Sequence, residues 1–443
     1  MTLTEMDRLL DLGEITPVDL VREAIENTEK YQEKVNAYIT FLPEDAMEAA
    51  EKATLEIKKH GRRSRMHGIP YGVKDLVFTK GIRTTAGSRM MKDFIPDTDG
   101  DSVKNMKEAG AILMGKHNTQ EWGCGPTGSK SYFGPVRNPY DNGRISGGSS
   151  SGSAAAVATG MVPCAVGTDA GGSIRIPSAL CGVAGFMPSR GIVGGNGAFS
   201  GSITLGNTGP IAQTAEDCAL MLDVMAMDKG VSYLDAVQSG GSLKGKKFAV
   251  PVNVFSDCVD DGVLKVFNEC VEKLRSAGAT VTETDMPWLL DVSSFSSSIT
   301  FPEIAYLHKD RLKENPEGYD PAIKARIERG FSYPACEYID ALEKRKRARA
   351  QWTEFMRDYD QVILPTEPVT ACPLYAETVN VNGTDHETAA LLVKHTRIAN
   401  VLGSPALSVN GGFADGLPVG IMFMGGINGD AKTLTLGAMF ERI

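Results

Sequence analysis

The sequence has little of what metal-dependent hydrolases use. Its six histidines include no H-x-x-x-H or H-E-x-x-H pair, and its eight cysteines include no C-x-x-C pair. Zinc sites usually draw their ligands from such closely spaced pairs. We therefore predict no metal site and no cofactor. The scattered cysteines are expected to be small buried hydrophobic side chains of a protein in a reducing compartment.

Long hydrophobic runs, a basic leader and an excess of positive charge are absent as well. No apolar stretch reaches the roughly 20 residues of a membrane-spanning helix, and residues 1–7 are neither basic nor strongly apolar. The formal net charge of -9 disfavours a surface for nucleic acid or anionic lipid. We therefore expect a cytoplasmic protein that has no nucleic-acid partner and no membrane association.

What the chain does contain is an alternation of short apolar runs with helical patterns. The runs that predict buried strands cover residues 111–114, 162–166, 248–250, 362–364, 406–409 and 420–423. The patterns that predict helices begin near residues 2, 16, 43 and 153, fill most of 291–357, and recur at 432–441. Such alternation predicts an α/β fold with helices on both faces of a sheet. Because no repeat or low-complexity linker divides the chain, we expect one large domain.

Two segments admit an anion-binding interpretation. Gly110–His117 nearly matches the phosphate loop G-x-x-x-x-G-K-[ST], but His117 stands where a hydroxyl must hold magnesium. The residues between its glycines are apolar, which favours a buried strand. The basic run Lys344–Arg347, with Arg349, is interpreted as the wet face of a long helix, and an anion site is the alternative.

Three residues stand in glycine- or serine-rich settings that packing alone does not explain. Lys74 lies in G-I-P-Y-G-V-K-D, Ser149 in G-G-S-S-S-G-S and Ser173 in G-T-D-A-G-G-S-I-R. A serine between glycines can expose its hydroxyl and let a substrate carbonyl approach backbone N–H groups. A lysine near two such serines is a candidate base for a hydrolase that uses no histidine.

The loop around Ser173 directly follows a predicted strand, where α/β proteins tend to place ligand-binding loops. Its successive N–H groups are expected to converge on one oxyanion. These predicted donors are Ala170, Gly171, Gly172 and Ser173. Asp169 and Arg175 flank the turn, and we expect them to brace it as an ion pair. For Ser149 and Ser150 the alternative role is to cap the helix that follows.

The three motifs resemble those of the amidase signature family, serine hydrolases that include fatty acid amide hydrolases, malonamidases and the amidase subunit of glutamyl-tRNA amidotransferases. The resemblance is strong over about 68–217 and weaker at 364–368 and 403–408. It implies one domain over 1–443, with a mixed central sheet covered by helices on both faces. It also implies a more variable helical region at about 290–400 that forms the substrate pocket.

By this resemblance Ser173 is the nucleophile, Ser149 relays the proton of Ser173, and Lys74 is the base. The resemblance also implies that the peptide bond before Ser149 is cis. The supporting residues are expected to be Ser150, Thr168, Asp169 and Arg175. A free lysine has a pKa near 10.4, whereas a general base works best at about 7–8. Burial among apolar neighbours is therefore required to lower the pKa of Lys74.

The function that the resemblance implies is an amidohydrolase for carbon–nitrogen bonds other than peptide bonds, acting on a small molecule through a Ser173 acyl-enzyme. The alternatives are the amidase (glutaminase) subunit of a tRNA-dependent amidotransferase and a carbamate- or urea-type hydrolase. Glutamine-using subunits carry an Asp where Val393 stands here, and other members often have an Asp at the place of Asn207. We therefore expect a small-molecule amide substrate. A homodimer is one possible oligomeric state.

The substrate pocket is expected to involve residues 120–135, 190–205 and 290–400. The aromatic residues that are candidates for its lining are Phe199, Phe295, Tyr306, Phe331 and Tyr333. Ordinary core packing is the alternative role for each of these side chains.

Overall fold

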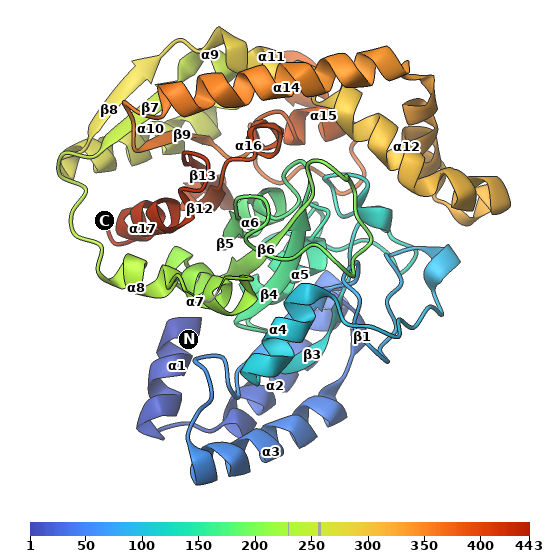
Figure 1. Ribbon diagram of the computed structural model, residues 1–443, viewed down its shortest axis with the longest axis vertical. Helices are drawn as coiled ribbons and strands as arrows, with labels where there is room; N and C mark the ends of the chain where they lie inside the picture. The colour runs from blue at the N-terminus through green and yellow to red at the C-terminus, as the bar shows by residue number, and fades with distance from the viewer. Residues whose placement is uncertain (229, 256–257) are drawn as a thin grey trace.

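The centre of the computed structural model, which describes residues 1–228, 230–255 and 258–443, is an 11-stranded mixed sheet (Figure 1). In spatial order its strands are β1 (Tyr38–Phe41), β3 (Ile112–His117), β2 (Pro70–Lys74), β4 (Cys164–Asp169), β6 (Asn207–Ala212), β5 (Ala184–Met187), β12 (Ala406–Ala414), β13 (Leu417–Met424), β9 (Gln361–Pro365), β7 (Lys247–Pro251) and β8 (Thr280–Thr284). A separate hairpin joins β10 (Thr378–Val381) to β11 (Thr384–Glu387). β2 runs parallel to β3 and β4, whereas β4 and β6 are antiparallel.

Helices cover both faces of this sheet, so the predicted α/β class and single large domain are confirmed. They are α1 (Leu3–Leu12), α2 (Pro17–Val35), α3 (Pro43–His60), α4 (Asp101–Ala109), α5 (Ser151–Ala158), α6 (Arg175–Cys181), α7 (Ala215–Met225), α8 (Tyr233–Gln238), α9 (Val252–Phe255), α10 (Asp261–Ser276), α11 (Pro287–Phe295), α12 (Ser297–Glu314), α13 (Pro321–Glu328), α14 (Ala335–Phe355), α15 (Thr388–Leu392), α16 (Thr396–Leu402) and α17 (Asp430–Glu441). Short 3-10 helices occur at Arg89–Met91, Glu121–Gly123, Pro316–Gly318 and Arg329–Ser332.

The helix starts predicted near residues 2 and 16 are found where expected. The Thr2 side chain accepts a hydrogen bond from the Glu5 N–H at the start of α1. Thr16 and Asp19 form a reciprocal capping box at the start of α2, which places Pro17 at a position that needs no N–H donor. These local bonds satisfy amide groups that a helix leaves unpaired at its N-terminus.

Helix α5 packs unusually close to its neighbours, because it is built from small residues. All of it except Ala158 is fully buried. A Cβ on Gly152 would collide with the Ala37 carbonyl and lie 2.7 Å from the Asn118 amide nitrogen. The capping role considered for Ser150 is wrong, since its hydroxyl instead donates to the Thr168 carbonyl at 3.1 Å. The small Gly and Ser residues therefore let the start of α5 pack directly against strand β4.

The two segments with a possible anion-binding role have structural explanations. The near-match to a phosphate loop is strand β3, and its Lys116 is buried with Nζ 3.3 Å from the Asp75 carboxylate. The basic run lies on α14, where Lys344 and Arg347 are exposed as predicted. Arg345, however, turns inward and donates to the Val401 carbonyl at the end of α16.

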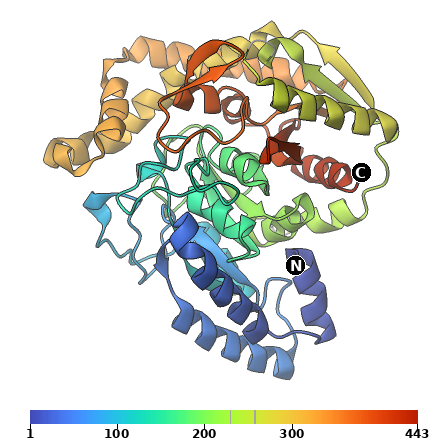
Figure 2. The same ribbon diagram turned by 180° about the vertical axis from the view of Figure 1, so that it is seen from behind.

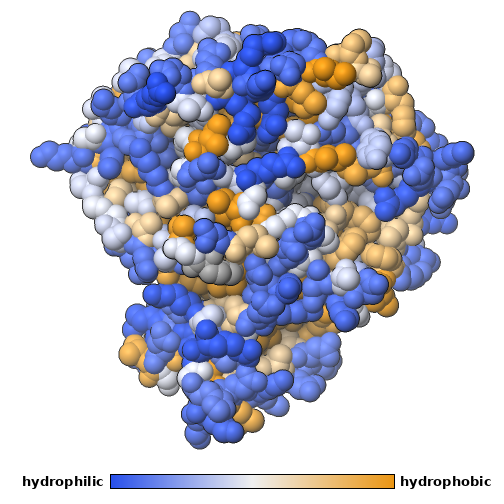
Figure 3. All heavy atoms as spheres, viewed as in Figure 1, coloured by the Kyte–Doolittle hydropathy of each residue, from blue (hydrophilic) through white to orange (hydrophobic). Residues whose placement is uncertain are grey.

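The N-terminal helices α1–α3 and the helices α11–α14 lie at opposite ends of the molecule, as both views show (Figures 1 and 2). The face seen in Figure 3 is mostly hydrophilic, with apolar residues in small groups. No helix in the described part of the chain combines the length and apolar character that a membrane crossing requires. Seven cysteines are buried, and the eighth, Cys336 near the start of α14, is exposed.

Candidate functional site

Lys74 and Ser149 meet inside the molecule, where strand β2 ends beside the turn that leads into α5. Lys74 Nζ donates to Ser149 Oγ at 2.7 Å and to Thr168 Oγ1 at 2.8 Å. The side chains of Lys74 and Ser149 are fully buried. The peptide bond between Gly148 and Ser149 is cis, as the resemblance implied. Two of the three predicted catalytic side chains are thus in direct contact.

The environment of Lys74 favours an uncharged amine. Burial lowers the pKa of Lys74 from 10.5 to about 7, although the negative charge of Asp169 opposes this shift. A pKa near neutrality makes the uncharged amine accessible, and its lone pair can accept a proton. The pKa therefore falls in the range that the sequence analysis required of a base.

Ser173 follows strand β4 and lines a cavity of about 200 Å³ together with Ser149. Its carbonyl accepts a hydrogen bond from the Ser150 N–H at 3.1 Å, which ties the two serine-bearing turns together. Among the described contacts, none is a hydrogen bond between Ser149 Oγ and Ser173 Oγ. The structure therefore joins Lys74 to Ser149 directly and brings Ser173 to the same cavity.

The predicted oxyanion donors need one correction. The Gly172 N–H already donates to Asp169 Oδ1 at 2.7 Å, so it is not free for a substrate. The N–H groups of Ala170, Gly171 and Ser173 have no acceptor among the described hydrogen bonds. All three residues line the cavities at the nucleophile. The candidate donor set is therefore these three amides, and Gly172 instead fixes the shape of the turn.

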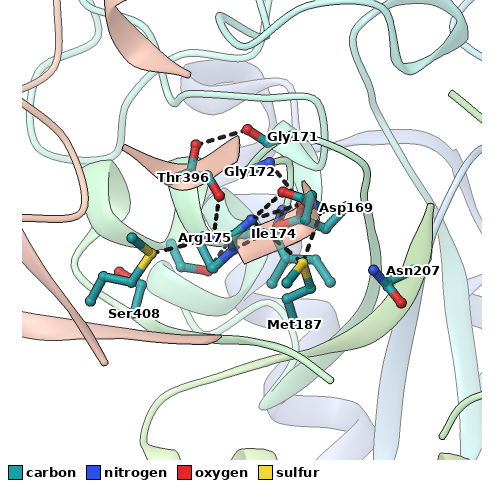
Figure 4. Close-up of polar contacts among 12 residues, drawn as sticks. Asp169, Gly171, Gly172, Ile174, Arg175, Met187, Asn207, Thr396 and Ser408 are labelled. Atoms are coloured by element: carbon teal, nitrogen blue, oxygen red, sulfur yellow. Dashed lines mark hydrogen bonds and ion pairs between the residues drawn. The ribbon is translucent and has the colours of Figure 1, made fainter. Parts of the chain in front are cut away.

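A buried network holds the turn in place (Figure 4). The Arg175 guanidinium contacts both oxygens of Asp169 at 3.1 Å, which confirms the predicted ion pair. The Asp169 carboxylate also accepts from the Ile174 N–H and the Asn400 side-chain amide. Burial alone would raise the pKa of Asp169, but the Arg175 charge and these donors outweigh it and hold the pKa below its usual value. Asp169 is therefore an anion that organises donors around itself.

Helix α16 contributes two residues that the sequence analysis missed. Thr396 Oγ1 donates to the Gly171 carbonyl at 2.8 Å, and the Thr396 carbonyl accepts from Arg175. Asn400 donates to Asp169 and accepts from Arg175 at 2.7 Å. The available signal was a short helix with three polar residues among apolar ones, which does not identify their partners.

The predicted aromatic lining is mostly wrong. Phe199 lines the cavity beside Ser173 and packs edge-on against Trp122. Tyr306 and Phe331 are exposed, and Tyr333 stacks on Phe301. Phe295 packs on the hydrophobic core. Phe301, which was not predicted, lines a second cavity of about 60 Å³ next to the nucleophile. The three predicted pocket segments do all contribute to these cavities.

Comparison with known proteins is consistent across sequence and structure. A family model described as Amidase matches residues 19–434. The A subunit of glutamyl-tRNA(Gln) amidotransferase from Marinobacter nauticus is 33% identical over 100% of this chain and 97% of its own length. The corresponding protein of Exiguobacterium sibiricum is 36% identical over 93% of this chain and 91% of its own length.

Solved structures give the same picture. A crystal structure described as an amidase has a TM-score of 0.93 and 33% identity, and covers 100% of this chain and 99% of its own. The A subunit of glutamyl-tRNA(Gln) amidotransferase from Thermotoga maritima has a TM-score of 0.82 and 29% identity, with 100% and 94% covered.

These relatives overturn the expectation that no nucleic acid is involved. Their names describe one subunit of an enzyme that acts on glutamyl-tRNA(Gln). The expectation rested on the net charge of -9. A net charge is a sum over the whole surface of one chain, and it contains no information about the charge of partner subunits.

Proposed function

Because this chain belongs to the amidase signature family, we propose that it hydrolyses a carbon–nitrogen amide bond through a covalent intermediate on Ser173. The observation that carries the proposal is the 2.7 Å hydrogen bond between Lys74 Nζ and Ser149 Oγ, at a cavity that Ser173 also lines. A nucleophile, a relay hydroxyl and a neutral amine together make a nucleophile–base system without histidine.

In the first step, Ser173 Oγ attacks the amide carbonyl carbon while its proton passes to Ser149, whose own proton moves to the Lys74 amine. The carbonyl oxygen becomes an oxyanion, and the free N–H groups of Ala170, Gly171 and Ser173 are its donors. Each such donor is worth roughly 10²–10³ in rate. The chain's own groups thus supply both the proton path and the charge stabilisation.

In the second step, the carbon–nitrogen bond breaks, and the leaving nitrogen takes the proton back from Lys74 through Ser149. The acyl group is then an ester of Ser173. Water attacks this ester, gives up a proton along the same path, and releases the acid. Ser173 regains its hydroxyl proton, so the enzyme returns to its starting state.

A fluorophosphonate probe and an amide panel test this proposal. The probe forms a bond to an activated serine oxygen, so peptide mapping of the labelled protein is expected to identify Ser173. Ser173→Ala is expected to abolish both labelling and amide turnover. Labelling at another serine, or turnover by Ser173→Ala, would contradict the assignment. Carbamates and ureas in the panel test the related hydrolase alternative.

A second and finer candidate is favoured by the curated relatives, which match the chain over essentially its full length. In this role the chain is the A subunit of an amidotransferase acting on glutamyl-tRNA(Gln), and Ser173 releases ammonia from an amide donor. The similarity supports this role better than that of a free-standing small-molecule amidase. Purification of the tagged chain from its own host is the test. The subunit role is supported if other subunits co-purify and the complex converts glutamyl-tRNA(Gln) to glutaminyl-tRNA(Gln). It is contradicted if the isolated chain alone hydrolyses amides at the full rate.

A further inference from the structure

A groove of about 500 Å³ lies beside helix α14, and the function proposed above makes no use of it. Its walls come from α14, from the segment 190–204, and from the turns that follow α16 and β13. Neither Ser149 nor Ser173 lines it, and Arg190 is the single described residue that it shares with the cavity at Ser173. We call it the α14 groove, and it is a hollow separate from that cavity.

Three arginines line the α14 groove. Arg345 and Arg349 are about one helical turn apart on α14, so they lie on the same face of that helix. Arg190 reaches the groove from the segment that follows β5. The structure thus divides the basic run on α14, because Lys344 and Arg347 are exposed and do not line the groove. The anion-site alternative for this run therefore concerns Arg345 and Arg349.

Each of these arginines uses only some of its N–H donors for backbone carbonyls. Arg190 donates to the carbonyls of residues 203 and 204, and Arg345 and Arg349 each donate to one carbonyl at the end of α16. A guanidinium carries five N–H donors, so most of them have no acceptor among the described hydrogen bonds. Capping of α16 accounts for the two arginines on α14 but not for Arg190. The convergence of all three needs another explanation.

No carboxylate balances the three charges. The described residues that line the α14 groove include no Asp or Glu, and no ion pair within 4 Å involves any of the three arginines among the described contacts. Glu303 attracts Arg345 only from a greater distance, and its buried carboxylate is already bound by neutral donors of the segment 202–204. Burial and the charges of Arg349 and Arg190 lower the pKa of Arg345 to about 10, and burial and the charge of Arg190 lower the pKa of Arg349. The arginines repel one another, and a bound anion removes that cost.

We propose that the α14 groove binds a phosphate group. A phosphate dianion offers several oxygens to the planar guanidinium forks, which bind such oxygens in pairs through charge-assisted hydrogen bonds. The volume of the groove falls within the roughly 300–1,000 Å³ typical of small-molecule sites, so it has room for an organic part attached to the phosphate. Ile203 and Ile427 supply apolar contacts for that part. The ligand class is therefore a small phosphomonoester, and free phosphate is the smaller member of the same chemistry.

Isothermal titration calorimetry of the full chain at constant ionic strength tests this inference with three compounds. Inorganic phosphate and AMP should each bind at one saturable site, whereas adenosine, which lacks the phosphate, should not bind. At least about tenfold tighter binding of AMP than of phosphate identifies a phosphomonoester as the ligand, and equal affinity identifies free phosphate. Absence of saturable binding by both phosphate and AMP, or adenosine binding as tight as that of AMP, would overturn the inference.

Variants locate the phosphate. Arg190→Gln and Arg349→Gln should each weaken the binding of phosphate and of AMP at least about tenfold, because each removes a charged donor. Arg347→Gln is the matched control, since Arg347 lies on α14 but does not line the groove. Arg397→Gln should also leave binding unchanged, because Arg397 lines the second cavity beside Ser173 and not the α14 groove.

Melting temperatures show whether these variants are folded. Arg190 does not cap α16, so Arg190→Gln keeps the test decisive if loss of that cap unfolds Arg349→Gln. Unchanged binding in Arg190→Gln, or loss of binding only in Arg397→Gln, would refute the assignment. Binding at the α14 groove is measured without amide turnover, so failure of this inference and failure of the proposed hydrolysis at Ser173 are distinguishable.

Discussion

Two buried lysines in this chain differ in what surrounds them, and only one is suited to be a base. Lys116 has the Asp75 carboxylate at 3.3 Å and donates to the Val77 carbonyl and to Thr84. Lys74 has no ion pair among the described contacts and donates to the hydroxyls of Ser149 and Thr168. Burial lowers the pKa of Lys116 too, to about 8, but the Asp75 charge favours its ammonium form. Lys116 also does not line the cavity that Ser149 and Ser173 share.

Replacement of Lys74 tests this difference through the pH profile. In the native enzyme kcat/KM is expected to rise with pH through about 7, because the amine accepts a proton only when it is neutral. Lys74→Met should lower kcat/KM by roughly 10²–10⁴ and should remove that rise. The measurement is amide hydrolysis between pH 5 and 9. If the variant keeps the same rise at about pH 7, another group is the base.

The adjacent glycines at 171 and 172 give a second residue-scale test. At Gly171 a Cβ would meet nothing within 4 Å. At Gly172 the φ angle is +127°, and a Cβ would collide with Thr396 Oγ1 and lie 2.6 Å from Ile176. Gly171→Ala should therefore keep activity within a few-fold, while Gly172→Ala should lower the free energy of unfolding by at least about 1–3 kcal/mol and abolish activity.

Thermal unfolding and amide turnover of the two purified variants check this pair. The comparison is controlled internally, since the same methyl group is added one residue apart. Equal behaviour of both variants would mean that the turn is not held as described.

The chemistry of individual residues was the part of the site most accessible from sequence. Lys74, Ser149 and Ser173 stand in local glycine- or serine-rich motifs that singled them out, and the resemblance to the amidase signature family implied their roles. The engagement of the Gly172 N–H by Asp169 was not predictable, because it depends on the φ angles of the turn. The proximity of Arg326 and Arg397 at one cavity was not predictable either, because about 70 residues separate them along the chain.

At the scale of elements, helix α16 contacts the nucleophile turn directly. It presents Thr396 to the Gly171 carbonyl and Asn400 to the Asp169–Arg175 ion pair. Both contacts end on backbone or side chains of the turn that carries Ser173. The position of the nucleophile therefore depends on a helix that begins more than 200 residues later in the chain.

Thr396→Val tests this positioning role. The substitution keeps the shape of the side chain but removes the hydroxyl that donates to Gly171, a bond worth roughly 1 kcal/mol in stability. We expect kcat to fall about tenfold while KM and the melting temperature change little. Thr396→Ser, which restores the hydroxyl, should recover most of kcat. A variant in which stability falls but kcat does not would assign Thr396 a structural role only.

The elements that the sequence predicted are those with strong local signals. The capped amphipathic helix α2 begins where it was predicted to begin, and the largely apolar strand β9 was found within a few residues of its bounds. The short strands β5 and β6 were missed, because A-G-F-M and N-T-G-P-I-A contain glycine or proline and resemble loops. The order of the strands in the sheet could not be predicted from the sequence. Strand β12 pairs with β5 across about 220 residues, and no local sequence pattern indicates that pairing.

At the scale of the molecule, the sheet interleaves early and late parts of the chain. Strand β5 from the first half lies between β6 and the late strand β12. The hydrophobic core follows this arrangement, with Leu407 of β12 buried against α17. Neither half of the sequence has a complete sheet of its own, so the two halves are expected to fold together.

Calorimetry of the full chain tests this cooperativity. We expect a single unfolding transition, and we expect Leu407→Ala to shift the whole transition because it removes about 2–5 kcal/mol of core packing. Residues 1–228 expressed alone should lack a cooperative transition, since β5 would lose its β12 partner. Two separable transitions in the native protein, only one of them moved by Leu407→Ala, would contradict this expectation.

The distribution of thiols has a practical consequence. With Cys336 exposed and the other seven cysteines buried, a maleimide fluorophore should attach at one place in the native protein. That place lies near the start of α14, which packs against α12, and α12 supplies Ser297 and Thr300 to the wall of the second cavity beside Ser173. A dye there is expected to report on that wall as ligands enter the cavity, and no cysteine has to be engineered into the chain.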